Sequence, residues 1–131
     1  MIALDTNVLV RFLTQDDPIQ AAAAARLIAR LTPEAPGFVA REVVVETVWV
    51  LERAYKYTRA EIAAALIGLL EARELRIEVD ARVGLAIDRY GKGGPGFSDQ
   101  MIRAAAGEAG CEALASFDRQ VAALEGGFVP Q

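Results

Sequence analysis

The chain has 131 residues, of which 53% are hydrophobic, and its formal net charge at neutral pH is −4. This length and apolar content are sufficient for a sizeable core, and we expect residues 1–131 to form a single domain. The acidic balance argues against a general attraction of the whole surface to nucleic acid, so a polyanionic substrate would need a local basic patch or a bound cation.

Two residue types with important chemistry are absent or nearly absent. There is no histidine, and Cys111 is the only cysteine. This composition excludes disulfide frameworks, thiolate metal sites and every mechanism that uses a histidine base, and it argues against zinc. No charged segment followed by a long apolar stretch begins the chain, and no apolar run approaches the roughly 20 residues that cross a bilayer. We therefore expect a soluble, cytoplasmic protein without a membrane partner.

Strands and helices alternate in the first part of the chain. The apolar run 1–4 predicts a buried strand that ends at Asp5, where a helical pattern over 6–14 begins. The pair Asp17–Pro18 is typical of a helix start, and the alanine-rich residues 19–31 favour a helix. Three further elements are expected: a strand over 38–40, a helix over 41–54, and a helix from the capping box at Thr58 and Glu61 to about Arg73.

The second part of the chain continues this alternation. The expected elements are a strand over 75–79, a helix from Asp80 to the glycine-rich loop 91–96, a helix capped by Ser98 over 99–109, a buried strand over 111–117, a short helix from Asp118 to Leu124, and an edge strand over 126–129. Strands separated by helices pair in parallel. We therefore predict an α/β fold, a three-layer α/β/α sandwich with a central, mainly parallel sheet.

Three aspartates lie at positions that suggest a ligand site. Asp5 and Asp118 each follow a predicted buried strand and precede a helix, so both are expected at the edge of the sheet where α/β proteins bind ligands. Asp99 lies in the first turn of a helix, where the helix dipole favours a negative charge. Helix capping explains each aspartate about equally well when it is considered alone.

A glutamate in the helix predicted after the second strand is harder to explain in this way. Glu46 lies on an apolar stripe between Val43 and Val50, and a buried carboxylate is unfavourable without a cation or a hydrogen-bond donor. Glu42 lies one turn earlier on the same side, where like charges repel unless a positive group lies between them. A salt bridge from Arg41 or another arginine to one of these acids is the structural alternative.

Carboxylates that converge without histidine or cysteine indicate Mg²⁺ or Mn²⁺. Several acids cannot all remain ionised without a counter-charge, and hard cations prefer oxygen ligands. Such an ion activates water and binds a phosphodiester, which is chemistry that requires no histidine. Thr6, Asn7 and Ser116 are candidates to orient ligands or water, although they also suit strand ends and helix caps.

Four segments carry these acids: LDTNVLVR at 4–11, VVVETVWVL at 43–51, FSDQMI at 97–102 and SFDR at 116–119. In this order they closely resemble the motifs of the PIN-domain ribonucleases, particularly the VapC-type toxins of toxin–antitoxin pairs, and the resemblance covers nearly the whole chain. It implies a Mg²⁺- or Mn²⁺-dependent endoribonuclease toxin, a homodimer, and a cognate VapB-like antitoxin. The residues that match the family's metal-binding and catalytic positions are Asp5, Glu46, Asp99 and Asp118, with Ser116 as the hydroxyl beside the last acid.

The resemblance leaves some positions open. Asn7 matches the polar residue that follows the first acid in the family. Ser98 and Gln100 stand where relatives more often have alanine, and we expect this to be tolerated because the carboxylate between them remains. Glu42 matches no clear family position, so it is either a supporting residue or the alternative to Glu46.

Basic residues close in sequence to these acids are candidates for contacts with RNA phosphates. They are Arg11, Arg89, Lys92, Arg103 and Arg119. The glycine-rich loop 91–96 lacks the order of residues of a P-loop and is better explained as a flexible connection.

Two other functions remain as alternatives. A haloacid-dehalogenase-like phosphohydrolase also has an acid after its first strand, but it needs a second aspartate where this chain has Asn7, and a positioned lysine, of which the chain offers only Lys56 and Lys92. The other alternative is a catalytically inactive interaction module whose acids are only helix caps.

Overall fold

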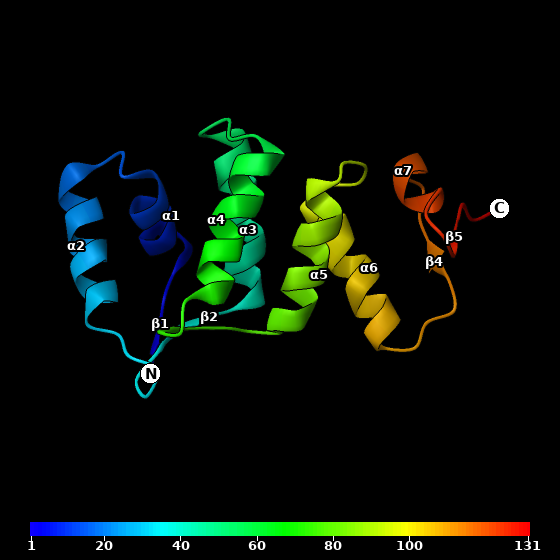
Figure 1. Cartoon of the computed structure of the whole chain (residues 1–131). Helices are drawn as coiled ribbons and strands as arrows, with labels where there is room; N and C mark the ends of the chain where they lie inside the picture. Colours follow the sequence, from blue (N-terminus) through cyan, green and yellow to red (C-terminus); the bar gives the residue numbers. More distant parts are fainter. The chain divides into compact units, whose positions relative to one another are not determined.

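A computed structural model describes all 131 residues and divides the chain into two compact units, Met1–Asp80 and Ala81–Gln131. Each unit contains its own parallel sheet and its own helices (Figure 1). None of the helices combines the length and the apolar composition that crossing a membrane requires.

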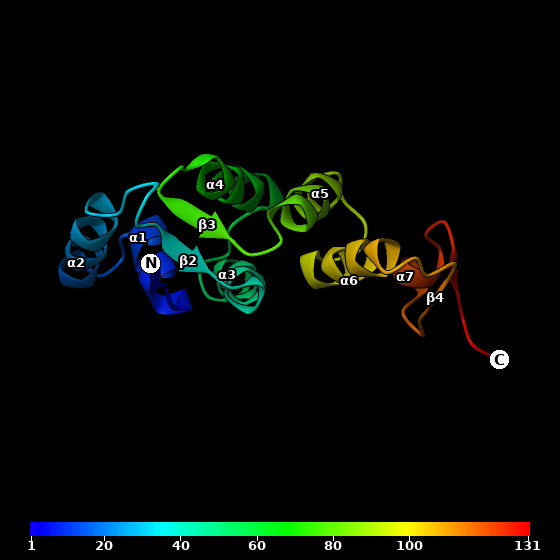
Figure 2. The same cartoon turned by 90° about the horizontal axis from the view of Figure 1, so that it is seen from below.

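The first unit contains a three-stranded sheet, and Figure 2 shows two of its strands, β2 and β3, side by side. Its elements are β1 (Ile2–Ala3), α1 (Thr6–Thr14), α2 (Pro18–Ala29), β2 (Gly37–Val39), α3 (Arg41–Arg53), α4 (Arg59–Glu71) and β3 (Leu75–Ile77). The strand order is β1-β2-β3, and both pairings are parallel. Because parallel strands end at the same edge of a sheet, α1 and α3 both begin at the edge where β1 and β2 end.

Most helix starts of the first unit lie where local signals predict them. Asp17 caps α2 by accepting hydrogen bonds from the backbone N–H groups of Ile19 and Gln20. The predicted capping box is also present, since Thr58 Oγ1 accepts from the N–H of Glu61 at 3.1 Å and Glu61 Oε1 accepts from the N–H of Thr58 at 2.9 Å. Both caps are confirmed because they depend only on residues close in sequence.

The prediction of a buried first strand is wrong for most of its length. Ile2 and Ala3 are exposed, and only Leu4, which follows the strand, is buried. The physical reason is that β1 is an edge strand of its sheet, paired on one side only.

A polar network joins α1 to the segment that follows α3. Arg11 donates hydrogen bonds to the hydroxyl of Tyr55 at 3.0 Å and to Gln20 Oε1 at 2.7 Å, and it forms an ion pair with Asp16 at 3.3 Å. The Tyr55 hydroxyl in turn donates to Asp16. This hydrogen bond is the main reason why the pKa of Asp16 lies below its usual value. The network holds α1, the helix that Asp5 caps, against the end of α3.

The second unit contains a two-stranded parallel sheet, and its helices are α5, α6 and α7. Its elements are α5 (Asp80–Gly91, which starts at the last residue of the first unit), α6 (Phe97–Glu108), β4 (Leu114–Ala115), α7 (Arg119–Ala122) and β5 (Gly127–Phe128). Two contacts join α5 to α6: an edge-to-face pair of Tyr90 and Phe97, and an ion pair of Arg82 with Glu108 at 2.7 Å. The predicted edge strand over 126–129 is confirmed as β5.

The strand predicted over 111–117 is much shorter than expected and is not buried. Gly110 has a φ of +80° and ends α6 in the left-handed conformation, and the N–H of Cys111 donates back to the carbonyl of Ala106. The residues before β4 therefore belong to the turn that ends the helix. Beyond β4, the side chain of Phe117 is 80% exposed.

Taken together, the alternation of helices with parallel strands confirms the α/β fold class. Three of the strands belong to the sheet of the first unit and two to that of the second.

Replacing Thr47 by valine is expected to stabilise the protein. Thr47 is fully buried in α3, and its hydroxyl has no hydrogen-bond partner. Valine has nearly the same shape without the unsatisfied polar atom, so Thr47→Val should raise the free energy of unfolding by about 1 kcal/mol in urea denaturation. The control Thr47→Ala leaves a small void and should lower it by about 1 kcal/mol. A Thr47→Val variant less stable than the wild type would contradict the absence of a partner.

Tyr55→Phe is expected to raise the pKa of Asp16 towards its usual value, because the hydrogen bond that lowers it is lost. A carboxyl group with a lowered pKa in the folded state contributes stability above its unfolded pKa and loses that contribution as the pH falls through the folded pKa. The variant should therefore show a weaker loss of stability below about pH 4 than the wild type. Carbon-detected NMR titration of the Asp16 carboxyl measures the shift, and an unchanged pKa would contradict this assignment.

Candidate functional site

Asp5 lies at the point where β1 ends and α1 begins. Its backbone is extended, and its Oδ1 accepts a hydrogen bond from the N–H of Thr6 at 2.8 Å. The side chain is exposed, and Oδ2 makes no hydrogen bond within the protein. The cap that offers a purely structural explanation is therefore present, and it leaves one carboxylate oxygen free for a ligand.

The two polar residues after Asp5 differ in their surroundings. Thr6 is buried, and its hydroxyl has no hydrogen-bond partner. Asn7 is exposed and lines a hollow of about 300 Å³ between α1 and α2, together with Arg11 and Gln20. Neither side chain has a hydrogen-bond partner within the protein that would account for a polar residue at its position.

Glu46 is exposed, so the prediction that it lies on a buried stripe is wrong. The buried residues of α3 are Val44, Thr47, Val48 and Leu51. This face is displaced by about one residue, or 100° of helical rotation, from the predicted stripe. Glu42, one turn before Glu46, is also exposed. Because both glutamates are exposed, burial does not require a cation beside either of them. They remain candidates only because of the sequence motif.

The structural alternative for these two glutamates is also wrong. Arg41 forms its ion pair with Glu78, just after β3, with 3.1 Å between Nε and Oε1. The backbone N–H of Arg41 donates to the same oxygen at 2.9 Å. Glu42 and Glu46 form no ion pair with any basic residue of the structure, so their charges are not compensated within the protein.

Asp99 is the third residue of α6 and is half-buried. Its Oδ2 accepts a hydrogen bond from the N–H of Gly96 at 3.3 Å, and Oδ1 makes none. The prediction that Ser98 caps this helix is wrong, because α6 begins at Phe97 with Gly96 as its cap.

The next residue along α6 is buried, which its sequence position did not indicate. Gln100 is only 2% exposed, and its Oε1 has no partner. The sequence showed Gln100 only as a substitution beside an acid.

Asp118 repeats the arrangement of Asp5 at the start of α7. Its Oδ1 accepts from the N–H groups of Gln120 at 2.8 Å and Val121 at 3.3 Å, and its exposed side chain makes no other hydrogen bond. Ser116 Oγ accepts from the backbone N–H of Asp118 at 3.0 Å, while the N–H of Ser116 donates to the carbonyl of Phe128 in β5. The Ser116 hydroxyl therefore fixes the turn that carries Asp118.

The donor set of these acids fits a hard divalent cation. Asp5 and Glu46 belong to the first unit, and Asp99 and Asp118 belong to the second. All four are carboxylates, none forms an ion pair, and each of the three aspartates keeps one oxygen without a protein hydrogen bond. Oxygen ligands of this kind suit Mg²⁺ or Mn²⁺. Neither unit by itself gathers three or more acidic, histidine or cysteine side chains into a metal-binding group.

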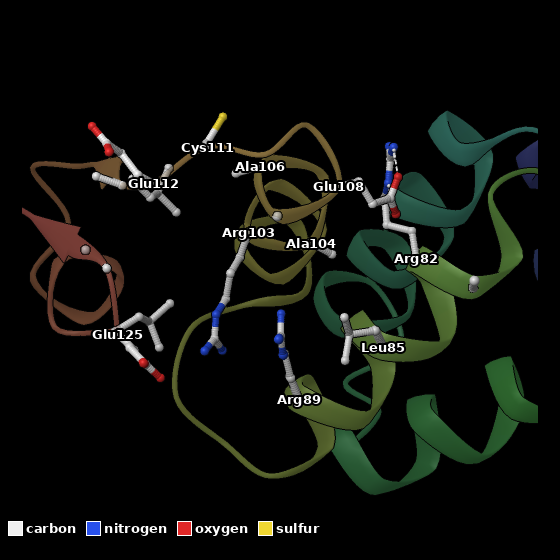
Figure 3. Close-up of a pocket in the computed structure, with 17 residues that line it drawn as sticks. Arg82, Leu85, Arg89, Arg103, Ala104, Ala106, Glu108, Cys111, Glu112 and Glu125 are labelled. Atoms are coloured by element: carbon white, nitrogen blue, oxygen red, sulfur yellow. Dashed lines mark hydrogen bonds and ion pairs between the residues drawn. The ribbon is translucent and has the colours of Figure 1, made fainter.

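The predicted RNA-contacting residues differ in their availability. Arg11 is engaged in the network with Asp16, and Lys92 pairs with an aspartate one turn earlier at 3.0 Å. Arg119, the first residue of α7, is exposed. Arg89 and Arg103 line a hollow of about 570 Å³ in the second unit and form no ion pair (Figure 3).

Comparison with known proteins shows which family this chain resembles. The chain is 28% identical over 121 residues to a VapC ribonuclease of Aquifex aeolicus, an alignment that covers 92% of this chain and 89% of that protein. The crystal structure of Mycobacterium tuberculosis VapC20, described as a Sarcin-Ricin loop cleaving toxin, aligns with a TM-score of 0.46 and 22% identity over 98% of this chain and 97% of that chain. Residues 2–127 match the PIN domain family, so this chain belongs to that family.

Proposed function

We propose that this protein is a Mg²⁺- or Mn²⁺-dependent endoribonuclease and the toxin of a toxin–antitoxin pair. The observation that carries the proposal is that a PIN-domain chain holds three aspartates by backbone N–H groups and leaves one oxygen of each free. The likeness to a VapC ribonuclease supports RNA as the substrate. Carboxylate chemistry with a hard cation also suits a chain that contains no histidine.

In this proposal the cation ligands are Asp5, Glu46, Asp99 and Asp118. A bound divalent cation supplies an activated water and compensates the charge of the phosphodiester. Asp5 and Asp118 are oriented for this role by the N–H groups that bind their Oδ1 atoms. Ser116 acts through Asp118, whose backbone N–H it binds.

Three other residues have supporting roles in the proposal. Thr6 and Asn7 are the polar side chains nearest to Asp5 in the chain, and Glu42 lies one turn before Glu46. Because Glu42 and Glu46 are both exposed on α3, a single charge-removing substitution at each position separates their contributions.

Membership of the PIN domain family decides against the phosphohydrolase alternative. Asn7 also stands where that class needs an aspartate. The remaining alternative, an inactive interaction module, is what the cleavage experiment below tests.

The proposed partners are RNA, a VapB-like antitoxin and a second copy of the chain, and the proposed location is the cytoplasm. These proposals follow from the similarity to VapC proteins, which the match over 92% of this chain supports. The proposed single domain over residues 1–131 is supported by one family match that spans both units. A monomer mass in light scattering would contradict the dimer.

Metal binding should depend on the proposed acidic ligands. Asp5→Ala and Asp99→Ala are each expected to weaken Mn²⁺ binding by at least about tenfold in calorimetry, because each removes a charged oxygen ligand. The matched control is Glu34→Ala, an exposed glutamate in the loop before β2 that should leave binding unchanged. Wild-type affinity in both aspartate variants would overturn the proposed ligand set.

RNA cleavage should require the cation and the charge of Asp118. EDTA is expected to abolish cutting of a panel of structured RNAs, and Asp118→Asn should slow it by at least about tenfold, because asparagine preserves the helix cap but removes the charge. Asp17→Asn, which removes the charge of the aspartate that caps α2 in the same way, is the control. Absence of metal-dependent cutting across the panel would favour the inactive interaction module.

A further inference from the structure

A hollow of the second unit combines two arginines with an apolar wall. It has a volume of about 570 Å³ and is bordered by α5, α6, β4 and the turn before β5. Arg89 comes from α5 and Arg103 from α6, and Figure 3 shows both side chains pointing into the same space.

The two arginines keep their charges available, unlike the third arginine of the hollow. Arg82 forms a bidentate ion pair with Glu108, with distances of 3.1 and 2.7 Å. No such pair or hydrogen bond is present for Arg89 or Arg103, and Figure 3 shows a dashed line only between Arg82 and Glu108. Two convergent guanidinium groups are well suited to one phosphate, which they bind through paired N–H donors.

The rest of the hollow suits a neutral, partly apolar group rather than a second anion. Leu85, Ala104 and Leu114 supply apolar surface, and the volume is in the range of pockets that enclose small organic ligands. Glu112 and Glu125 lie on the side formed by β4 and the turn before β5. Their carboxylates repel additional negative charge but accept hydrogen bonds from ribose hydroxyls or base amino groups. This distribution of charge favours a nucleotide over an acidic peptide.

The position of Arg103 relates this hollow to one of the proposed cation ligands. Arg103 follows Asp99 by four residues in α6, so it lies on the same helix face about 6 Å further along the axis. The two side chains form no ion pair with each other, so both remain available for separate ligands.

From these observations we propose that the hollow binds one nucleotide of the RNA substrate, with its phosphate on Arg89 and Arg103 and its nucleoside against the apolar wall. The proposal rests on the proposed ribonuclease function, since that function makes RNA the substrate. The two arginines are binding residues that hold the chain of the RNA close to Asp99, the proposed ligand on the same helix as Arg103.

Fluorescence anisotropy with a fluorescein-labelled single-stranded RNA tests this assignment. The titration is done in EDTA, so that no cleavage takes place and the result does not depend on metal chemistry. The double variant Arg89→Gln/Arg103→Gln should bind about tenfold more weakly. The slope of the logarithm of its association constant against the logarithm of the salt concentration should also be less steep by about 0.7. This is the value for one lost phosphate contact with a single strand.

Two further variants make the result specific. Arg26→Gln/Arg76→Gln removes the same charge from exposed positions of the first unit and should bind RNA like the wild type. Arg89→Lys/Arg103→Lys keeps the charge but loses the paired donors, so its affinity should be intermediate. Unchanged Mn²⁺ binding by the glutamine variant would show that the cation site and the fold are intact.

Wild-type RNA affinity and salt dependence in the glutamine variant would overturn the proposal. The proposal would also be overturned if the glutamine variant lost affinity for a poly-glutamate peptide and not for RNA, because the hollow would then serve a protein partner. A protein that binds RNA through these arginines but never cuts it would instead contradict the ribonuclease function and leave the nucleotide site intact.

Discussion

Backbone N–H groups at helix starts hold the aspartates on which the proposed chemistry depends. An N–H donor fixes one carboxylate oxygen without neutralising the charge, whereas an arginine partner compensates it. Asp5 and Asp118 are held in the first way only, whereas Glu78 accepts from both the backbone N–H and the guanidinium group of Arg41. Capping alone does not mark a site, because Asp17 caps α2 in the same way. Asp5 and Asp118 differ from Asp17 because each lies shortly after a parallel strand. At this edge of a sheet, a ligand can contact several elements at once.

The sequence predicts those features of the fold that depend on neighbouring residues. The caps at Asp5 and Asp17 and the capping box at Thr58 are decided within about four residues, so their patterns are sufficient. The buried face of α3 is different, because valines at 43, 44, 45, 48 and 50 surround much of the helix. Periodicity then leaves the centre of the apolar face uncertain by one residue. That uncertainty made exposed Glu46 look buried, and only packing against other elements resolves it.

The end of α6 and the arginine hollow were beyond sequence patterns for two different physical reasons. The apolar composition of 111–117 favours a strand, but Gly110 in the left-handed conformation continues the helix turn to Cys111 and shortens β4 to two residues. Arg89 and Arg103 lie on different helices, and no periodic pattern connects them. Their shared orientation depends on how α5 and α6 pack, through Tyr90 against Phe97 among other contacts. The candidate acids could be found in the sequence because each belongs to a short motif. Arg89 and Arg103 could be named only because they lie close in sequence to these acids, and the hollow that they share could not be predicted.

An acidic protein that acts on RNA must overcome the repulsion between two negative charges. With a net charge of −4, the surface as a whole repels a phosphate chain, and the uncompensated carboxylates add to this repulsion where cleavage is proposed. Arg11 and Lys92 do not offset it, since each already pairs with an aspartate. The attraction must therefore be local, from a bound cation at the carboxylates and from arginines whose charges remain free. Local attraction within an acidic surface also limits binding to phosphates that can reach these groups, so the same electrostatics that weaken general RNA binding favour selective binding.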